Sequence, residues 1–439
     1  MYLSLTNTPA EPDPSGTPRG PKAANRVSSV VISLGIVSML TDVSSESVSA
    51  ILPLYVTGVI GLSTVAYGFL DGLYQGVSAV VRLGAGWAAD RGGQPKWVAF
   101  SGYGLAAVAR IFLLFVTSFA GLTAVLTADR LGKGIRTAPR DALITAASKP
   151  GNLAASFGVH RTLDNIGAAV GPLLAFIILL VIPNGFSTVF VVSLAFALLG
   201  VAVLGIIVPN MRTRSTAIID LETSRDQAAA TITASASSAM TVAPPRASDR
   251  WRELNNPGLK RLLLVAGLLG VLTIGDGFIY LVLQNRSSFA AQFFPLLYVG
   301  TNIAFLAFAV PIGRLADRFG RARTFLFGHV FLLAAYLSAT LPVTGAAITI
   351  VCLVLLGGYY AASDGILSVL ATQFTASDTR ATAIGAVARF ISSAGFGILW
   401  FARGREWSML IVSIAIASVI PIVAVILRSA RRYRADVAA

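Results

Sequence analysis

Long apolar stretches alternate with short polar connections along most of the chain. Each stretch has about 20 residues or more, the length that an α-helix needs to cross the hydrocarbon core of a bilayer. The pattern therefore predicts an all-α membrane protein with twelve transmembrane helices. The predicted spans are residues 30–57, 64–88, 97–117, 121–146, 153–182, 187–208, 259–284, 290–313, 323–342, 346–372, 380–402 and 407–428.

One long break divides the predicted spans into two sets of six. Residues between the sixth and seventh spans are rich in Ala, Ser and Thr and lack an apolar pattern, as is typical of a flexible linker. The first residues are rich in Pro and Gly and predict a disordered tail. The expected organisation is a tail at 1–29, a six-helix bundle at 30–208, a linker at 209–257, a second bundle at 258–428 and a tail at 429–439.

Composition supports the membrane interpretation and fixes an orientation. Only 12% of the residues are charged, against about 25% in soluble globular proteins. The net charge of +14 does not indicate nucleic-acid binding here, because most Lys and Arg residues lie in the connections on one side of the predicted helices. That side is expected to be cytoplasmic. The protein is therefore expected to be a multi-pass protein of the cell membrane with both termini in the cytoplasm. A single cysteine, Cys352, and two histidines argue against a disulfide or a metal site.

A short charged stretch occurs twice. "GWAADRGGQPK" occupies residues 86–96 and "GRLADRFGRAR" occupies residues 313–323. Six predicted spans separate the copies, so both lie on the cytoplasmic side. The two bundles are therefore expected to have the same orientation and to be related by an axis along the membrane normal. The residues of these loops are Gly86, Asp90 and Arg91 in the first copy, and Gly313, Asp317, Arg318, Gly320 and Arg321 in the second.

This organisation resembles the major facilitator superfamily, and two further motifs extend the resemblance. "ADRLGKG" at 128–134 is similar to that family's fourth-helix motif. "GVHRTLDNIGAAVGP" at 158–172 resembles the fifth-helix signature of bacterial drug/proton antiporters, although Leu173 departs from it. The resemblance implies two pseudo-symmetric bundles, alternating access, gating by the repeated loops, and close helix packing at Gly158, Gly167, Gly171 and Pro172.

Charged residues inside predicted spans are the candidates for ion coupling. A charge at a helix centre costs roughly 2.5–3.5 kcal/mol on insertion scales. Asp42 and Glu46 lie one turn apart on the first span, and the resemblance implies that the first and fourth helices line a central cavity. Burial favours a neutral carboxyl group and a nearby cation favours a charged one, so alternating access can switch its protonation. The candidate proton carriers are Asp42, Glu46, Asp129 and Asp164.

The same reasoning gives a set of candidates for the substrate cavity. The second bundle has fewer charges than the first, which suggests ion coupling in the first bundle and apolar substrate contact in the second. For each charged residue the alternative is an ion pair that only fixes packing. The candidates are Arg130, Lys133, Arg136, Arg161, Asp276, Tyr359, Tyr360, Asp364 and Arg389.

The sequence thus predicts a secondary active transporter that exports small apolar or amphipathic compounds in exchange for protons. An alternative is a transporter of an organic anion held by the cationic residues of the first bundle. A more remote alternative is a membrane-embedded enzyme or sensor, but no nucleophile, cofactor or metal motif accompanies the paired acids. We expect no enzyme activity, no cofactor and no phosphate-binding loop. The expected partners are a small-molecule substrate, protons and the lipid bilayer, and the expected state is a monomer.

Overall fold

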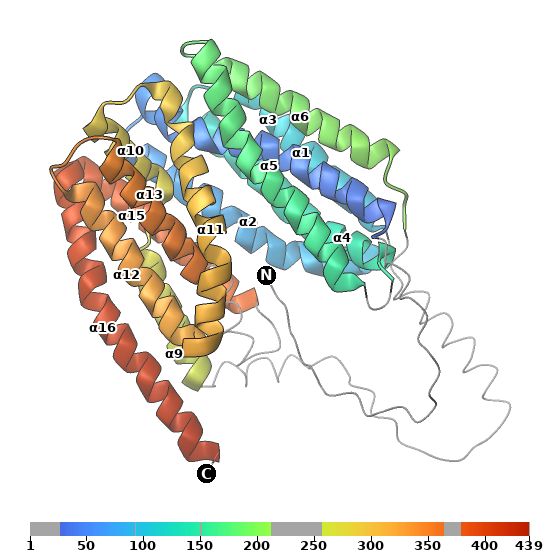
Figure 1. Ribbon diagram of the computed structural model, residues 1–439. Helices are drawn as coiled ribbons and strands as arrows, with labels where there is room; N and C mark the ends of the chain where they lie inside the picture. The colour runs from blue at the N-terminus through green and yellow to red at the C-terminus, as the bar shows by residue number, and fades with distance from the viewer. Residues whose placement is uncertain (1–26, 93, 150–151, 212–256, 364–378, 439) are drawn as a thin grey trace, which may run out of the picture.

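The computed structural model describes residues 27–92, 94–149, 152–211, 257–363 and 379–438, which form helices joined by short connections and contain no strand (Figure 1). The chain begins with six long helices. Ser28 caps the first of them, since its hydroxyl accepts a hydrogen bond from the amide of Val30. These helices are α1 (Ser29–Leu54, followed by the π-helical turn Tyr55–Val59), α2 (Thr64–Gly92), α3 (Pro95–Leu113), α4 (Phe119–Ala147), α5 (Leu153–Val181) and α6 (Phe186–Ile206).

The second part of the described chain contains seven more long helical segments. They are α9 (Pro257–Val271), α10 (Asp276–Ser287), α11 (Pro295–Phe319), α12 (Arg321–Thr340), α13 (Ala346–Ser363), α15 (Thr379–Arg403) and α16 (Arg405–Ala438). A short 3-10 turn, Ala291–Phe293, precedes α11. The last helix continues to Ala438, through the residues that the sequence assigned to a tail. The linker lies outside the described residues.

Length and composition make this an all-helical membrane protein. Within the described residues, nine helices are long and apolar enough to cross a bilayer. Helices α2, α3 and α4 are not among them, although α2 and α4 each have 29 residues. Helix α4 carries six charged side chains between Asp129 and Asp141, and three of them (Asp129, Arg130 and Arg136) are buried inside the protein. Its polar residues therefore turn away from lipid.

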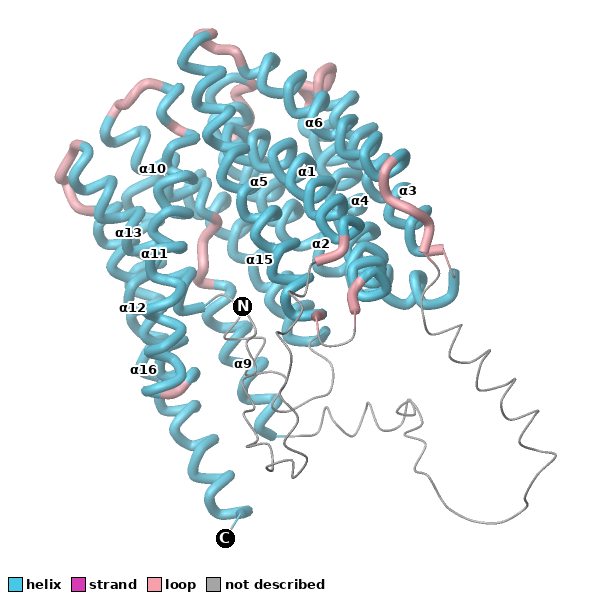
Figure 2. The backbone as a smooth tube through the Cα atoms, turned by 45° about the vertical axis from the view of Figure 1, so that its right-hand side comes forward, coloured by secondary structure: helices cyan, strands magenta, loops and turns pink. Residues whose placement is uncertain are grey.

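The seventh predicted span, 259–284, is wrong as a continuous helix. It is divided into α9 and α10, and residues 272–275 between them are not helical (Figure 2). Tyr336 satisfies part of the freed backbone, because its hydroxyl accepts from the amide of Ile274 at 2.8 Å and donates to the carbonyl of Leu272 at 3.1 Å. Ser392 donates to the carbonyl of Thr273. Neighbouring helices thus supply the hydrogen bonds that a broken helix needs at membrane depth.

The helices form two groups, which Figure 1 shows on the right (α1–α6) and on the left (α9–α16). Within the first group α1 packs on α5 and α6, and α3 packs on α4. Within the second group α13 packs on α11 and α12, and α12 packs on α16. Helix α2 packs along α15, and α5 contacts α11, so these two pairs join the groups.

Among the described side chains, the groups share a hydrophobic core on one side of the molecule. We call the side on which α6 ends and α9 begins the linker side, and the other side the distal side. On the distal side a single hydrophobic cluster contains residues of both groups, such as Ile51, Tyr67, Phe278 and Phe396. On the linker side the hydrophobic clusters are separate, and each belongs to one group. Within the described residues, a hydrophobic cluster therefore joins the two groups on the distal side.

Candidate functional site

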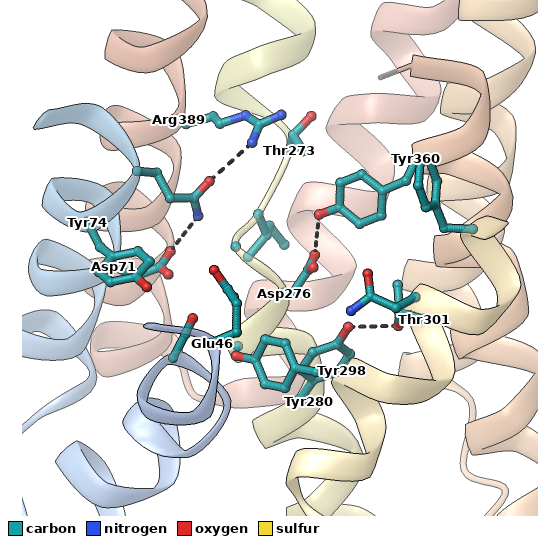
Figure 3. A pocket seen from close by; sticks show the side chains of 17 residues that line it. Glu46, Asp71, Tyr74, Thr273, Asp276, Tyr280, Tyr298, Thr301, Tyr360 and Arg389 are labelled. Carbon is teal, nitrogen blue, oxygen red and sulfur yellow. Dashed lines mark hydrogen bonds between the residues drawn. The ribbon is translucent and has the colours of Figure 1, made fainter. Parts of the chain in front are cut away.

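A cavity of about 350 Å³ lies between the two groups of helices (Figure 3). Its walls come from α1 and α2 of the first group, and from the α9–α10 break, α10, α11, α13 and α15 of the second. The lining residues are Glu46, Ser49, Asp71, Tyr74, Gln75, Thr273, Ile274, Gly275, Asp276, Gly277, Tyr280, Tyr298, Thr301, Asn302, Phe305, Tyr360 and Arg389. Most of them are polar or aromatic, so the second group contributes a polar wall.

Asp71 is the acid of the first group that contacts the second. It lies on α2, and its Oδ2 accepts hydrogen bonds from Ser393 of α15 at 2.6 Å and from Gln75 at 3.1 Å. Arg389 of α15 donates to the other end of the Gln75 amide at 3.3 Å. The α2–α15 contact is close because Gly68 lies against the backbone of α15, where an added Cβ would meet the carbonyl oxygen of Ser393.

Asp276 is the corresponding acid of the second group. It is the first residue of α10, directly after the non-helical segment, and its Oδ1 accepts a hydrogen bond from Tyr360 at 2.6 Å (Figure 3). Gly275 precedes it and packs against the carboxylate of Asp71, which leaves no room for a Cβ at this position. The broken helix thus brings a backbone segment and a carboxylate into the cavity, as discontinuous helices do at transporter binding sites.

Buried ion pairs hold the first group together beside this cavity. Asp129 on α4 is 1% exposed, and its two carboxylate oxygens lie 3.0 Å from Arg110 Nη2 and 2.5 Å from Arg130 Nη2. The guanidinium of Arg130 also stacks on the ring of Tyr74, 3.6 Å from its centroid. This one carboxylate therefore pairs with two buried cations from two helices.

Asp42 and Glu46 of α1 share one cation. Lys133 Nζ lies 3.8 Å from Asp42 Oδ1 and 3.9 Å from Glu46 Oε1. Asp42 is buried and is also 3.7 Å from Arg136 Nη2, whereas the side chain of Glu46 is 29% exposed and reaches the cavity. The structure thus brings together four residues that the sequence selected as candidates, and it gives the two acids different surroundings.

The other candidates of the first group lie outside the cavity lining. Asp164 accepts a hydrogen bond from Ser38 at 2.5 Å between α5 and α1. Arg161 is exposed on α5 and makes no ion pair with a described residue. Gly167 and Gly171 lie against the backbone of α1, and Pro172 beside them is buried, whereas Gly158 faces open space.

In the second group, Tyr360 and Arg389 line the cavity with Asp276, but Tyr359 does not. Tyr359 is buried one layer behind, where its hydroxyl lies 3.4 Å from Thr273 Oγ1. Asp364 lies outside the described residues. In the first repeated loop, Gly86, Asp90 and Arg91 lie at the end of α2, and their side chains are outside the described part of the chain.

The second repeated loop closes α11 on the linker side. Asp317 is exposed in the last turn of α11 and makes no hydrogen bond or ion pair within the described residues. Gly320 joins α11 to α12 with φ of +94°, a conformation that side chains with a Cβ disfavour. Gly313, Arg318 and Arg321 are exposed beside it.

Sequence reasoning missed Asp71 and Arg110. Both are charged residues inside apolar spans, the same signal that selected Asp42 and Asp276. Gln75 follows Asp71 by one helical turn, so a polar stripe on α2 was also visible. The contact of Asp71 with Ser393, which comes 322 residues later, was not visible in either local pattern.

Comparisons with known proteins agree with the fold. The family model described as Major Facilitator Superfamily matches residues 34–400. An uncharacterized MFS-type transporter of Methanocaldococcus jannaschii, MJ1317, is 26% identical over 360 residues, which cover 80% of this chain and 82% of that protein. The crystal structure of the nucleoside transporter NupG has a TM-score of 0.70 at 14% identity, covering 91% of this chain and 99% of that one. A POT family transporter in complex with 5-aminolevulinic acid has a TM-score of 0.71 at 13% identity, covering 92% and 97%.

Proposed function

This chain belongs to the major facilitator superfamily and is a membrane transporter rather than an enzyme. From that premise we propose that it exports small amphipathic compounds in exchange for protons, by alternating access. The observation that carries the proposal is the cavity between the two groups of helices, together with their shared distal core and separate linker-side cores. Such an arrangement exposes the cavity to one side at a time when the groups rock against each other.

The proposed architecture is twelve spans in two six-helix bundles of the same orientation. Reciprocal packing supports it: the second helix of the first group, α2, packs on the fifth of the second group, α15, and α5 contacts α11 in the same manner. We propose, from the positive-inside rule, that the linker side faces the cytoplasm and that the protein is a monomer of the cell membrane.

Proton coupling is assigned to the acids of the first group. Glu46 reaches the cavity and shares Lys133 with the buried Asp42, so protonation of Glu46 would transfer Lys133 fully to Asp42. Asp129 and Asp164 have buried partners and are assigned to holding the helices. An organic anion is disfavoured as substrate, because Arg130, Lys133 and Arg136 already have carboxylate partners and none of them lines the cavity.

The test is proton movement in proteoliposomes that contain a pH-sensitive dye. A panel of amphipathic cations, neutral amphiphiles and organic anions is added with and without an imposed pH gradient. At least one amphipathic compound should move protons in a protein-dependent way and be driven by the gradient. Proton movement with organic anions alone would transfer the proposal to the anion transporter, and no movement with any compound that binds the purified protein would contradict proton coupling.

Replacing Asp317 with Asn should slow transport about tenfold at equal membrane levels. Asp317 is exposed, and we propose that it bonds a helix end of the other group when the linker side closes. One hydrogen bond to a charged group contributes about 1.5–3 kcal/mol, which corresponds to roughly tenfold or more in an equilibrium. Transport rates per inserted molecule decide it, and an unchanged rate would remove Asp317 from the gate.

A further inference from the structure

We infer that the cavity between the groups binds an organic cation, held between Asp71 of the first group and Asp276 of the second and against tyrosine rings. The inference rests on the proposed transport function and names the chemical class of its substrate. It follows from three features of the cavity: its charge balance, its aromatic wall and its position between the two groups of helices.

The charge balance of the cavity is negative. Among the described residues, its lining contains the carboxyl groups of Glu46, Asp71 and Asp276 and one guanidinium, that of Arg389. Glu46 is matched by Lys133 from behind the wall. Asp71 and Asp276 accept hydrogen bonds from neutral groups only, and neither makes an ion pair with a described Lys, Arg or His. Both side chains are partly buried. A charged partner offsets the desolvation of a charge that is taken from water, and a cationic ligand supplies one.

The first group does not provide that partner, although it is rich in cations. Arg110 and Arg130 are bound to Asp129, and Arg136 and Lys133 are bound to Asp42. These pairs lie behind the cavity wall, since none of the four cations lines the cavity. Each of these four cations therefore already has a carboxylate partner, and the two acids of the cavity remain for a ligand.

Four tyrosine rings surround the acids: Tyr74, Tyr280, Tyr298 and Tyr360 (Figure 3). The faces of aromatic rings attract cations, and such rings recognise quaternary ammonium groups in proteins. Tyr74 shows this preference within the structure, because Arg130 stacks on its ring at 3.6 Å. Its hydroxyl is buried and has no hydrogen-bond partner among the described residues.

Asp71 and Asp276 belong to different groups of helices. Asp71 lies on α2 and Asp276 begins α10 beside the non-helical segment 272–275. A cation bound between them contacts both groups. Its binding can therefore change the equilibrium of the movement that opens the distal side. The first turn of α10 carries the positive end of the helix dipole, and Asp276 meets it with its own carboxylate, so this end does not create an anion site.

The test is equilibrium binding to the purified full-length protein in detergent, with no membrane and no gradient. The probes are benzyltrimethylammonium as cation, benzyl alcohol as neutral compound and benzenesulfonate as anion, measured by calorimetry. The cation should bind more tightly than the other two. Asp71→Asn and Asp276→Asn should each weaken cation binding by about 10- to 100-fold, the range expected for one charged partner. Glu406→Gln, which removes an exposed acid of α16 outside the cavity, should leave binding unchanged.

A second pair of variants tests the aromatic wall. Tyr298→Phe keeps the ring and should retain cation binding, whereas Tyr298→Leu should weaken it about 2- to 30-fold. Benzenesulfonate binding as tightly as the cation, or equal cation binding by the wild type and both Asp variants, would overturn the inference. If an Asp variant does not fold, the comparison of the three probes on the wild type still decides. Proton movement in vesicles is independent of this result, so the two proposals can fail separately.

Discussion

Glu46→Gln is expected to abolish transport driven by a pH gradient while leaving exchange of substrate across the membrane at near its original rate. Exchange needs no net proton movement, so a variant that binds substrate but no longer releases a proton keeps it. The structure makes Glu46 the acid to test first, because its side chain reaches the cavity. Its only ion pair among the described residues is with Lys133, and in the variant Lys133 keeps its second partner, Asp42.

Asp42→Asn should behave differently. Asp42 is buried and lies near both Lys133 and Arg136, so its neutralisation leaves the buried Arg136 guanidinium without an acid among its described ion-pair partners. We expect less folded protein from this variant in addition to any loss of coupling.

The measurement compares expression, exchange and gradient-driven transport of both variants in the same vesicles. Glu46→Asp, which keeps a titratable group, and Glu406→Gln, which removes an exposed acid elsewhere, are the matched controls. Gradient-driven transport at the wild-type rate in both neutralised variants would exclude Asp42 and Glu46 as proton carriers and move the test to Asp129 and Asp164.

Asp129→Asn is expected to cost about 3–5 kcal/mol of folding free energy, the range measured when one partner of a buried ion pair is removed. Asp129 is 1% exposed and compensates both Arg110 and Arg130, so its neutralisation leaves two buried cations without this acid. The yield of monodisperse protein and its thermal unfolding in detergent would both fall.

Asp141→Asn is the matched control for this loss. Asp141 pairs with Arg140 at 3.0 Å on the same helix, but its side chain is 42% exposed. Water can replace such a partner, so the change should cost at most about 1 kcal/mol. Equal stability of the two variants would show that the buried ion pairs of α3 and α4 do not hold the first group together.

The sequence predicted the helices well wherever apolar length decides. Spans such as 153–182 and 187–208 correspond to α5 and α6 within a few residues. It failed at α9–α10, where the run "VLTIGDG" combines β-branched residues with two glycines and weakens the helix. That signal was present, but the hydrogen bonds that stabilise the break come from Tyr336 and Ser392, distant residues that no local pattern identifies.

The candidate site was predicted in its chemistry but not in its assembly. The cost of inserting a charge into the membrane was enough to select Asp42, Glu46 and Asp276. A charged residue in an apolar span is stable only if it faces a partner or a water-filled cavity. It did not separate a residue in an ion pair, such as Arg136, from a residue in the cavity, such as Asp276. That difference depends on which helices face each other, and the contact between α2 and α15 joins residues more than 300 positions apart.

The central claim is that the two groups alternate between opening on the linker side and opening on the distal side. Spin-label distances test it most directly, with one pair at exposed positions Ser118 and Ala290 on the distal side and another at Lys149 and Arg323 on the linker side. Spectra are recorded in mildly acidic and mildly alkaline buffer, with and without an amphipathic compound that moves protons in vesicles. The account predicts that the distal distance lengthens in the population in which the linker-side distance shortens. Constant distances under all conditions, or two distances that lengthen together, would contradict it.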